Sequence, residues 1–294
     1  MPQDLFIPVG RGPNEARVTL QLPIPPKHTF QRARGALSIS AMPDPTGVSR
    51  LQNLRQEGSF RAIFPRPTVG KLEAVAINTA GGVTGGDQFS ISVDAQENAR
   101  VTITTQAAER IYRAAEGGAG QIANQLTADK GAQLFWLPQE TILFEGCQLQ
   151  RKLDVEVDQS ASALILEPLV FGREASGETL RSCTFQDHVS ITTKGQPIYL
   201  DRIHMNGDLA ATLGRSGIAQ GARAMASLVL VDPDAQRMLA PCRDLLPTTA
   251  GASLLSDRVL VVRMLASDSF ALRSALLPIL KLLTNDTVPK NWRL

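Results

Sequence analysis

The sequence predicts a mainly β fold of stacked strand–turn–strand repeats, similar to a β-helix, with a few helices. Strand-like segments with alternating or β-branched residues dominate from residue 36 onward. A unit of two strands and a polar turn recurs three times at a spacing of roughly 30 residues, which is typical of solenoid repeats. Helical periodicity is clearest near the C-terminus, over residues 269–283.

The three copies of the repeat span residues 91–106, 125–139 and 155–168. In each copy, a short strand is followed by a polar turn and a second strand. Such a unit cannot bury its apolar face alone, so we expect the copies to stack on one another. Hairpins at this interval occur in any β-rich protein, and the sequence alone leaves that alternative open.

The chain of 294 residues is expected to form a single domain, with a proline-rich, loosely held lead over residues 1–30. The formal net charge of +2 gives no electrostatic case for binding nucleic acid or an anionic membrane. The first residues lack the basic start and apolar run of a signal peptide, and the longest apolar runs are too short to span a bilayer. Cys147, Cys183 and Cys242 are far apart in sequence, which indicates reduced thiols in a cytoplasmic protein.

The predicted C-terminal helix, residues 269–283, has Asp268 or Ser267 as its candidate N-cap. Pro278 lies inside this helix and is expected to kink it. Residues 105–115 fit either a helix or the continuation of a strand.

A glycine-rich segment is the most particular motif of the chain. It comprises two glycine pairs and an aspartate, namely Gly81, Gly82, Gly85, Gly86 and Asp87. An apolar stretch precedes it and a strand-like alternation follows, so we expect a sharp connection between two strands. The spacing matches neither a dinucleotide-binding fingerprint nor a P-loop, and the segment does not open a helix, which argues against a nucleotide site.

Further blocks follow the glycine segment in a fixed order. Residues 104–113 end in Tyr112 and Arg113, and the chain closes on a Pro-x-x-Trp block that ends at Trp292. Between them lie two blocks at residues 136–146 and 166–174. Together, from about residue 32 to the C-terminus, these blocks resemble the urease accessory protein family UreD, which is called UreH in some systems.

This resemblance implies a β-helix-like fold and a non-enzymatic scaffold for urease maturation. Such a protein would bind apo-urease on one side and the accessory protein UreF on the other, and UreF would recruit the GTPase UreG. The resemblance also implies a water-filled channel toward the urease active site, with nickel in transit and no permanently bound cofactor. The apolar C-terminal block, including Trp292, is expected to contribute to the surface that binds UreF.

Acidic residues are the candidate nickel path. Glu109, Glu140 and Glu167 follow the second strands of the three repeats, so stacking would place them along one side. Asp87 ends the glycine segment and Asp201 follows a further strand. Carboxylates can escort a divalent cation, although nitrogen and sulfur ligands bind nickel more strongly. The competing interpretation is that each carboxylate caps a turn or pairs with a nearby arginine.

Two other functions stay open from the sequence. One is a hydrolase of β-helical fold that uses the carboxylate pair Glu140 and Glu145, or the pair Glu174 and Glu178. The other is a structural β-solenoid. The three histidines have no metal-ligand spacing, and Tyr112 is expected to be a core or interface residue.

Overall fold

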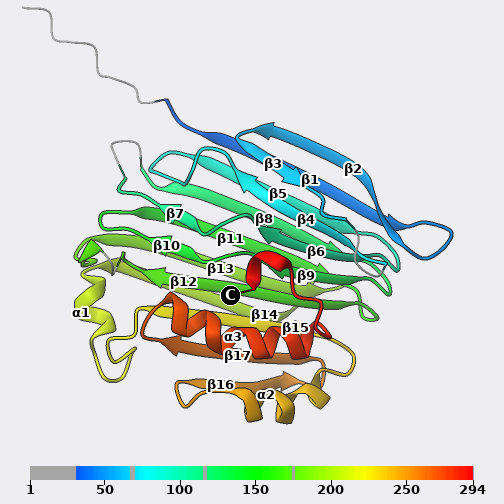
Figure 1. Ribbon diagram of the computed structural model, residues 1–294. Coiled ribbons are helices and arrows are strands. Elements are labelled where there is room, and N and C mark those ends of the chain that lie inside the picture. The colour runs from blue at the N-terminus through cyan, green and yellow to red at the C-terminus, as the bar shows by residue number, and fades with distance from the viewer. Residues whose placement is uncertain (1–30, 67–69, 115–117, 174–175, 294) are drawn as a thin grey trace, which may run out of the picture. The chain divides into compact units, whose positions relative to one another are not determined.

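A computed structural model describes residues 31–66, 70–114, 118–173 and 176–293. From Arg32 onward the chain forms one structural unit that contains two β-sheets (Figure 1). The proline-rich lead predicted for residues 1–30 lies outside the described residues. None of the described helices is long and apolar enough to cross a membrane.

Over the described residues, sheet A has seven strands and sheet B has ten. In spatial order, the strands of sheet A are β14 (Gln196–Gly207), β13 (Cys183–Thr193), β11 (Gln148–Val157), β8 (Gly120–Ala128), β5 (Gln88–Ala95), β1 (Arg34–Pro43) and β2 (Ser49–Gly58). The main path of sheet B consists of β16 (Ala250–Ser256), β17 (Val259–Ala266), β15 (Ala224–Val231), β12 (Ser162–Phe171), β9 (Gln133–Leu137), β6 (Arg100–Thr105), β4 (Leu72–Asn78) and β3 (Phe60–Ile63). Two short strands, β7 (Glu109–Ile111) and β10 (Thr141–Leu143), join sheet B beside this path.

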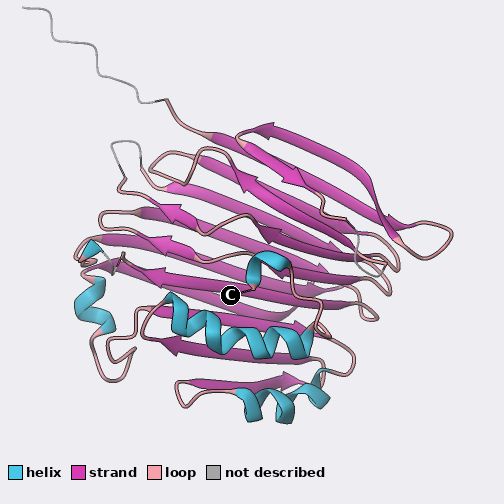
Figure 2. Ribbon diagram, in the orientation of Figure 1, coloured by secondary structure: helices cyan, strands magenta, loops and turns pink. Residues whose placement is uncertain are grey.

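The helices are few, as expected, and they gather toward the end of the stack formed by β14 to β17 (Figure 2). They are α1 (Leu209–Leu213), α2 (Leu239–Leu245) and α3 (Ser269–Leu283), with short 3-10 turns η2 (Ala235–Met238) and η3 (Lys290–Trp292). The predicted C-terminal helix is confirmed as α3. Its N-cap is Asp268, whose carboxylate accepts a hydrogen bond from the Ala271 N–H at 2.8 Å, and Pro278 lies inside it.

The predicted stacking of the repeats is confirmed by the strand register. The first strands of the three copies, β5, β8 and β11, are parallel neighbours in sheet A, with Ile91, Asn124 and Leu153 level with one another. The second strands, β6, β9 and β12, are parallel neighbours in sheet B. The two strands of each copy belong to different sheets. The copies are therefore coils of a β-solenoid of about four turns and not hairpins.

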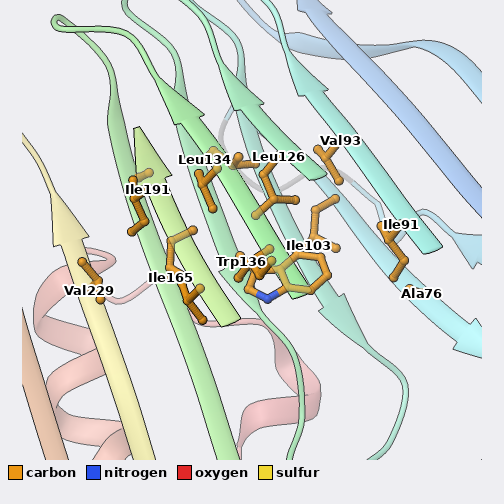
Figure 3. Packing of buried hydrophobic residues seen from close by; sticks show 14 of the residues in the cluster. Ala76, Ile91, Val93, Ile103, Leu126, Leu134, Trp136, Ile165, Ile191 and Val229 are labelled. Atoms are coloured by element: carbon orange, nitrogen blue, oxygen red, sulfur yellow. The ribbon is translucent and has the colours of Figure 1, made fainter. Parts of the chain in front are cut away.

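Alternation along each strand explains which face is buried. In β11, Leu149 and Leu153 point between the sheets and are buried, whereas Gln150 and Lys152 are exposed on the outer face of sheet A. Side chains from the two sheets meet in the interior, where Trp136 lies among aliphatic residues of neighbouring strands (Figure 3). The outer face of sheet B forms a second apolar cluster with α3, so strand β12 is buried on both of its faces.

The region that the sequence left undecided, residues 105–115, contains a strand and no helix over its described part. It holds the short strand β7, which pairs in parallel with β10. The glycine segment connects β4 to β5, as predicted, and Val83 within it forms a bridge to Ile111 of β7. Val83 thereby extends this part of sheet B, formed by β12, β10 and β7, by one backbone segment beside β7.

Candidate functional site

Sheet B is interrupted at the same level in successive coils. Residues 106–108 separate β6 from β7, and residues 138–140 separate β9 from β10, whereas β12 runs through without a break. Pro138 follows β9 directly and has no N–H with which to continue the ladder. The polar blocks of the repeats therefore gather at one break in the sheet.

A cavity of about 220 Å³ opens at this break and extends between the sheets. We call it the sheet B cavity. The polar residues of its wall are Asn78, Thr105, Gln106, Glu109, Arg110, Asn124, Gln139, Thr141, Arg151 and Glu167. Gln106 and Ala107 also line it and are exposed, so the cavity reaches the surface at the connection between β6 and β7.

Glu109 lies at the outer part of this cavity and is partly exposed. The Asn78 side-chain amide donates to both of its carboxylate oxygens at 3.2 Å. Burial raises the pKa of Glu109 to about 7, although the hydrogen bond from Asn78 opposes this change. Glu109 is therefore close to half ionised at neutral pH, and a cation that entered the cavity would favour its charged form.

Glu167 lies deeper, in a buried group of charges. Its carboxylate accepts a hydrogen bond from the Trp136 indole N–H at 2.8 Å and forms an ion pair with Arg151 at 2.6 Å. Arg151 also forms an ion pair with Asp187 at 2.6 Å, and all three charged side chains are less than 9% exposed. Burial raises the pKa of Glu167, while the charge of Arg151 opposes this change.

Glu140 faces the opposite side of sheet B, so the expectation that the three glutamates share one side is wrong for this residue. Thr141 is level with Glu109, which puts Glu140 one position out of phase with Glu109. Its carboxylate is bound by Arg273 of α3 at 2.9 Å. The repeats are in register as strands, but the connection before β10 shifts the acidic residue by one position.

The other two acidic candidates bind groups of the fold outside the cavity wall. Asp87 is buried and accepts hydrogen bonds from the Ala33 N–H at 2.8 Å and the Thr84 N–H at 2.9 Å. Asp201 of β14 forms an ion pair with Arg263 of β17. Asp87 thus closes the glycine segment, and Asp201 links the last strands of the two sheets.

The glycine segment is shaped by the residues packed against it. Gly81, Gly82 and Gly86 have positive φ, and Gly85 is buried. A Cβ atom on Gly82 would lie 2.4 Å from Cε2 of the Tyr112 ring, so this glycine is required by close approach as well as by backbone conformation.

The two residues that end the next block, Tyr112 and Arg113, hold this corner of the fold together. Tyr112 packs edge-on against Phe144, with 5.1 Å between ring centroids, and its hydroxyl donates to the Gly81 carbonyl at 3.3 Å. The Arg113 carbonyl accepts a hydrogen bond from the Thr84 hydroxyl at 2.9 Å. Tyr112 is 38% exposed, so its ring also forms part of the surface.

Comparison with known proteins identifies the family. A family model described as UreD urease accessory protein matches residues 31–293, which is most of the chain. The chain belongs to the UreD family of urease accessory proteins. The resemblance derived from the sequence motifs is confirmed, and membership supports a role in urease maturation.

Several UreD proteins match over nearly their whole length. The urease accessory protein UreD of Ruegeria pomeroyi is 49% identical over 244 residues, covering 83% of this chain and 95% of that protein. UreD of Roseobacter denitrificans is 46% identical over 263 residues, covering 90% and 96%. UreD of Rhizobium rhizogenes is 41% identical over 265 residues, covering 90% and 95%.

Trp292, near the C-terminus, is not exposed as a partner-binding residue would be. Its side chain is fully buried, and its indole N–H donates to the Leu137 carbonyl at 2.9 Å. The Arg273 guanidinium lies 4.6 Å from the ring centroid. The indole ring is thus part of the core and contributes nothing to the exposed surface.

Sequence reasoning missed Arg151 and Asp187, although the sequence contains a signal for both. Each lies at a buried phase of an alternating strand, Arg151 between Leu149 and Leu153 and Asp187 one strand further on. The register places them directly opposite each other. A charged residue at an inward position of a strand predicts a buried partner.

The carboxylate pairs proposed for a hydrolase are bonded to the backbone or to arginine. Glu145 accepts hydrogen bonds from the Arg181 N–H at 2.7 Å and the Ser182 N–H at 3.1 Å. Glu178 forms an ion pair with Arg173 at 3.0 Å, and Glu174 lies outside the described residues. Over the described ranges, no three His, Cys, Asp or Glu side chains form a group that would hold a metal ion.

The fold brings two of the three cysteines together. Cys147 and Cys183 are distant in sequence, but neighbouring strands place their sulfur atoms 3.1 Å apart. Both are free and buried, and hydrogen bonding to Cys183 together with burial raises the pKa of the Cys147 thiol. A thiol in this state is unreactive and behaves as an apolar core group.

Proposed function

We propose that this UreD-family chain is a non-enzymatic scaffold and conduit that assists nickel insertion into the urease active site. It binds apo-urease on one side and the complex of UreF with the GTPase UreG on the other. Nickel is cargo in transit and not a resident cofactor. The protein acts in the cytoplasm and requires neither nucleic acid nor a membrane.

The sheet B cavity carries this proposal. It runs from the exposed connection at Gln106 and Ala107 to the buried interior between the sheets. Glu109 is partly exposed near the outer end, and Glu167 is buried further in. Two carboxylates in sequence along a polar cavity supply successive oxygen ligands for a divalent cation.

Weak binding is the property that a conduit needs. Nickel is held more tightly by nitrogen and sulfur ligands than by oxygen, and the described residues of the cavity wall contain no histidine or cysteine. Asn78 donates to both oxygens of Glu109, and Glu167 is bound by Trp136 and Arg151. Each carboxylate has about four lone-pair sites, so part of each remains for a hydrated cation. The cavity is therefore suited to pass nickel on and not to store it.

Because Trp292 is buried, we assign the partner-binding surface to the exposed side of α3 instead. Phe270, in the first turn of α3, is 69% exposed, which is the highest value among the large apolar side chains of the described residues. Exposed aromatic residues of this kind are common anchors in protein interfaces. We assign Phe270 to the surface that meets UreF.

The proposal is tested by co-expressing Glu109→Gln and Glu167→Gln variants with the full set of urease proteins. We expect less nickel per urease active site, with unchanged recovery of UreF, UreG and urease on a tagged UreD chain. The matched control is Asp154→Asn, which removes a carboxylate from the outer face of sheet A. Control-like nickel content in both variants would reject the cavity as the path and leave only the scaffold.

A further inference from the structure

Arg151 is fixed between two carboxylates at the inner end of the sheet B cavity. Its Nη1 atom lies 2.6 Å from the Glu167 carboxylate and donates to the Thr141 hydroxyl at 3.1 Å. Its Nε and Nη2 atoms donate to the two oxygens of Asp187 at 2.9 and 2.6 Å. Every nitrogen of the guanidinium is therefore bonded, and its position is determined from both sides.

With both carboxyl groups ionised, the three side chains together carry a net charge of −1 inside the protein. Arg151 and Glu167 both line the cavity, whereas Asp187 contributes nothing to its wall. A cation that arrives from the surface thus meets Glu167 and the guanidinium, and Asp187 is shielded behind Arg151. Uncompensated buried charge is unfavourable, so the site attracts positive charge even with Arg151 in place.

One buried amide of the cavity wall has an N–H group without a hydrogen-bond partner in the described part of the chain. Gln139 is only 4% exposed and lines the cavity, and its Nε2 atom has no hydrogen-bond partner among the described residues. Its Oε1 atom is already used by Arg273, which fixes the direction of the amide. A buried amide with no protein partner is unfavourable, and water is the usual partner of such a group in proteins.

We propose that Arg151 is a tethered counter-ion that prevents Glu167 and Asp187 from jointly holding a divalent cation, so that cargo passes the inner end of the cavity. This inference rests on the proposed function. The guanidinium occupies the space between the two carboxylates, so a cation that is attracted by their net charge cannot enter that space. With Arg151 present, a cation contacts the single carboxylate of Glu167. Without it, two carboxylates and the Thr141 hydroxyl would surround a space of suitable size for an ion with oxygen ligands.

The test compares metal retention by UreD variants purified in complex with their co-expressed partners. Arg151→Met keeps the length of the side chain and removes the charge. Arg263→Met is the matched control, because Arg263 also pairs with an acidic residue, Asp201, but neither residue lines the cavity. Each complex is incubated with Ni²⁺ alone, desalted, and analysed for retained metal by mass spectrometry.

We expect Arg151→Met to retain at least about ten times more nickel than the wild type or Arg263→Met, since a positive charge in contact with the site has been removed. Arg151→Met combined with Asp187→Asn should lose the gain, because one of the two carboxylates is then neutral. Equal retention by Arg151→Met and the control would overturn the proposal.

Growth with and without added nickel covers the case of poor folding. Soluble Arg151→Met that accumulates only in nickel-containing medium supports the proposal, because the metal then replaces the missing charge. Insoluble variant in both media contradicts it. Failure of the proposed function is a separate result, since it appears as normal urease nickel content in Glu109→Gln and Glu167→Gln whatever Arg151→Met retains.

Discussion

Glu109 is the first residue of β7, whereas Glu140 directly precedes the neighbouring parallel strand β10, and their carboxylates face opposite sides of sheet B. Glu109 points to the sheet B cavity, where Asn78 binds it. Glu140 is held on the outer side by Arg273 of α3. The first carboxylate is thus available to a cation that enters the cavity, whereas the second fastens the C-terminal helix to the sheet.

We therefore predict that Glu140→Gln damages stability and leaves nickel transfer intact. Breaking a largely buried ion pair on one side leaves Arg273 without its charge partner, a loss of roughly 3–5 kcal/mol at the upper end. Thermal unfolding of the purified chain or its UreF complex measures this loss. Normal stability combined with reduced urease nickel content would show that Glu140 belongs to the path.

The raised pKa of Glu109 predicts a pH dependence of stability. The folded protein binds this proton more tightly than the unfolded chain, because the pKa rises from an ordinary 4.5 to about 7. The free energy of unfolding is therefore highest below about pH 4.5 and decreases as the pH rises to about 7. This group accounts for a decrease of up to about 3 kcal/mol.

A Glu109→Gln variant lacks this group and should not show its contribution. We expect the difference in unfolding free energy between Glu109→Gln and wild type to grow in favour of the variant between about pH 4.5 and pH 7, and to level off above that range. Denaturant unfolding at several pH values measures it. A constant difference across that window would mean that the carboxylate is not buried as described.

Gly82→Ala is predicted to cost more stability than the same substitution at a glycine of positive φ that has open space around it. The new Cβ would meet the Tyr112 ring at 2.4 Å and the Arg110 carbonyl at 2.6 Å. We expect a loss of roughly 2–4 kcal/mol from overpacking and backbone strain. Gly195→Ala is the control, because Gly195 has a φ of 71° but no atom within 4 Å of the new Cβ. Equal losses would mean that close approach to Tyr112 is unimportant.

Trp292 and Phe270 are predicted to fail in different ways. Trp292→Ala removes a fully buried side chain and its hydrogen bond, so we expect a loss of about 3–5 kcal/mol in stability. Phe270→Asp changes an exposed side chain and should leave the unfolding temperature almost unchanged while it weakens binding to UreF. Unfolding and pull-down measured together separate the two. Unchanged UreF binding by Phe270→Asp would remove this face of α3 from the interface.

The repeat pattern predicted the fold because its cause is local. A polar turn between two alternating strands at a constant interval determines both the coil length and the buried face, and the observed register of β5, β8 and β11 follows from it. The helix at residues 269–283 was equally readable, since its apolar spacing and its cap at Asp268 lie within one segment.

The site was less predictable, because its members depend on register and on contacts between distant segments. Thr104 is level with Leu137, and Glu109 is level with Thr141, so the path to β10 is one residue shorter than the path to β7. This difference reverses the face of Glu140, and no local pattern reveals it. Trp292 appeared to be a surface residue because the last block is short and apolar. Only the fold shows that it packs beside Leu137, 155 residues earlier in the chain.

The central claim is that nickel passes through the sheet B cavity, and a steric block at its mouth tests this most directly. Ala107 is exposed and lines the cavity, so Ala107→Trp should obstruct the mouth without removing any charge. Ala123→Trp is the control, because Ala123 is exposed on β8 and is not part of the cavity wall. Both variants are co-expressed with the full set of urease proteins, and nickel per urease active site is measured beside the recovery of UreF, UreG and urease. We expect a clear loss of nickel for Ala107→Trp alone, with complete assembly of both complexes. Wild-type nickel content in a fully assembled Ala107→Trp complex would contradict this claim.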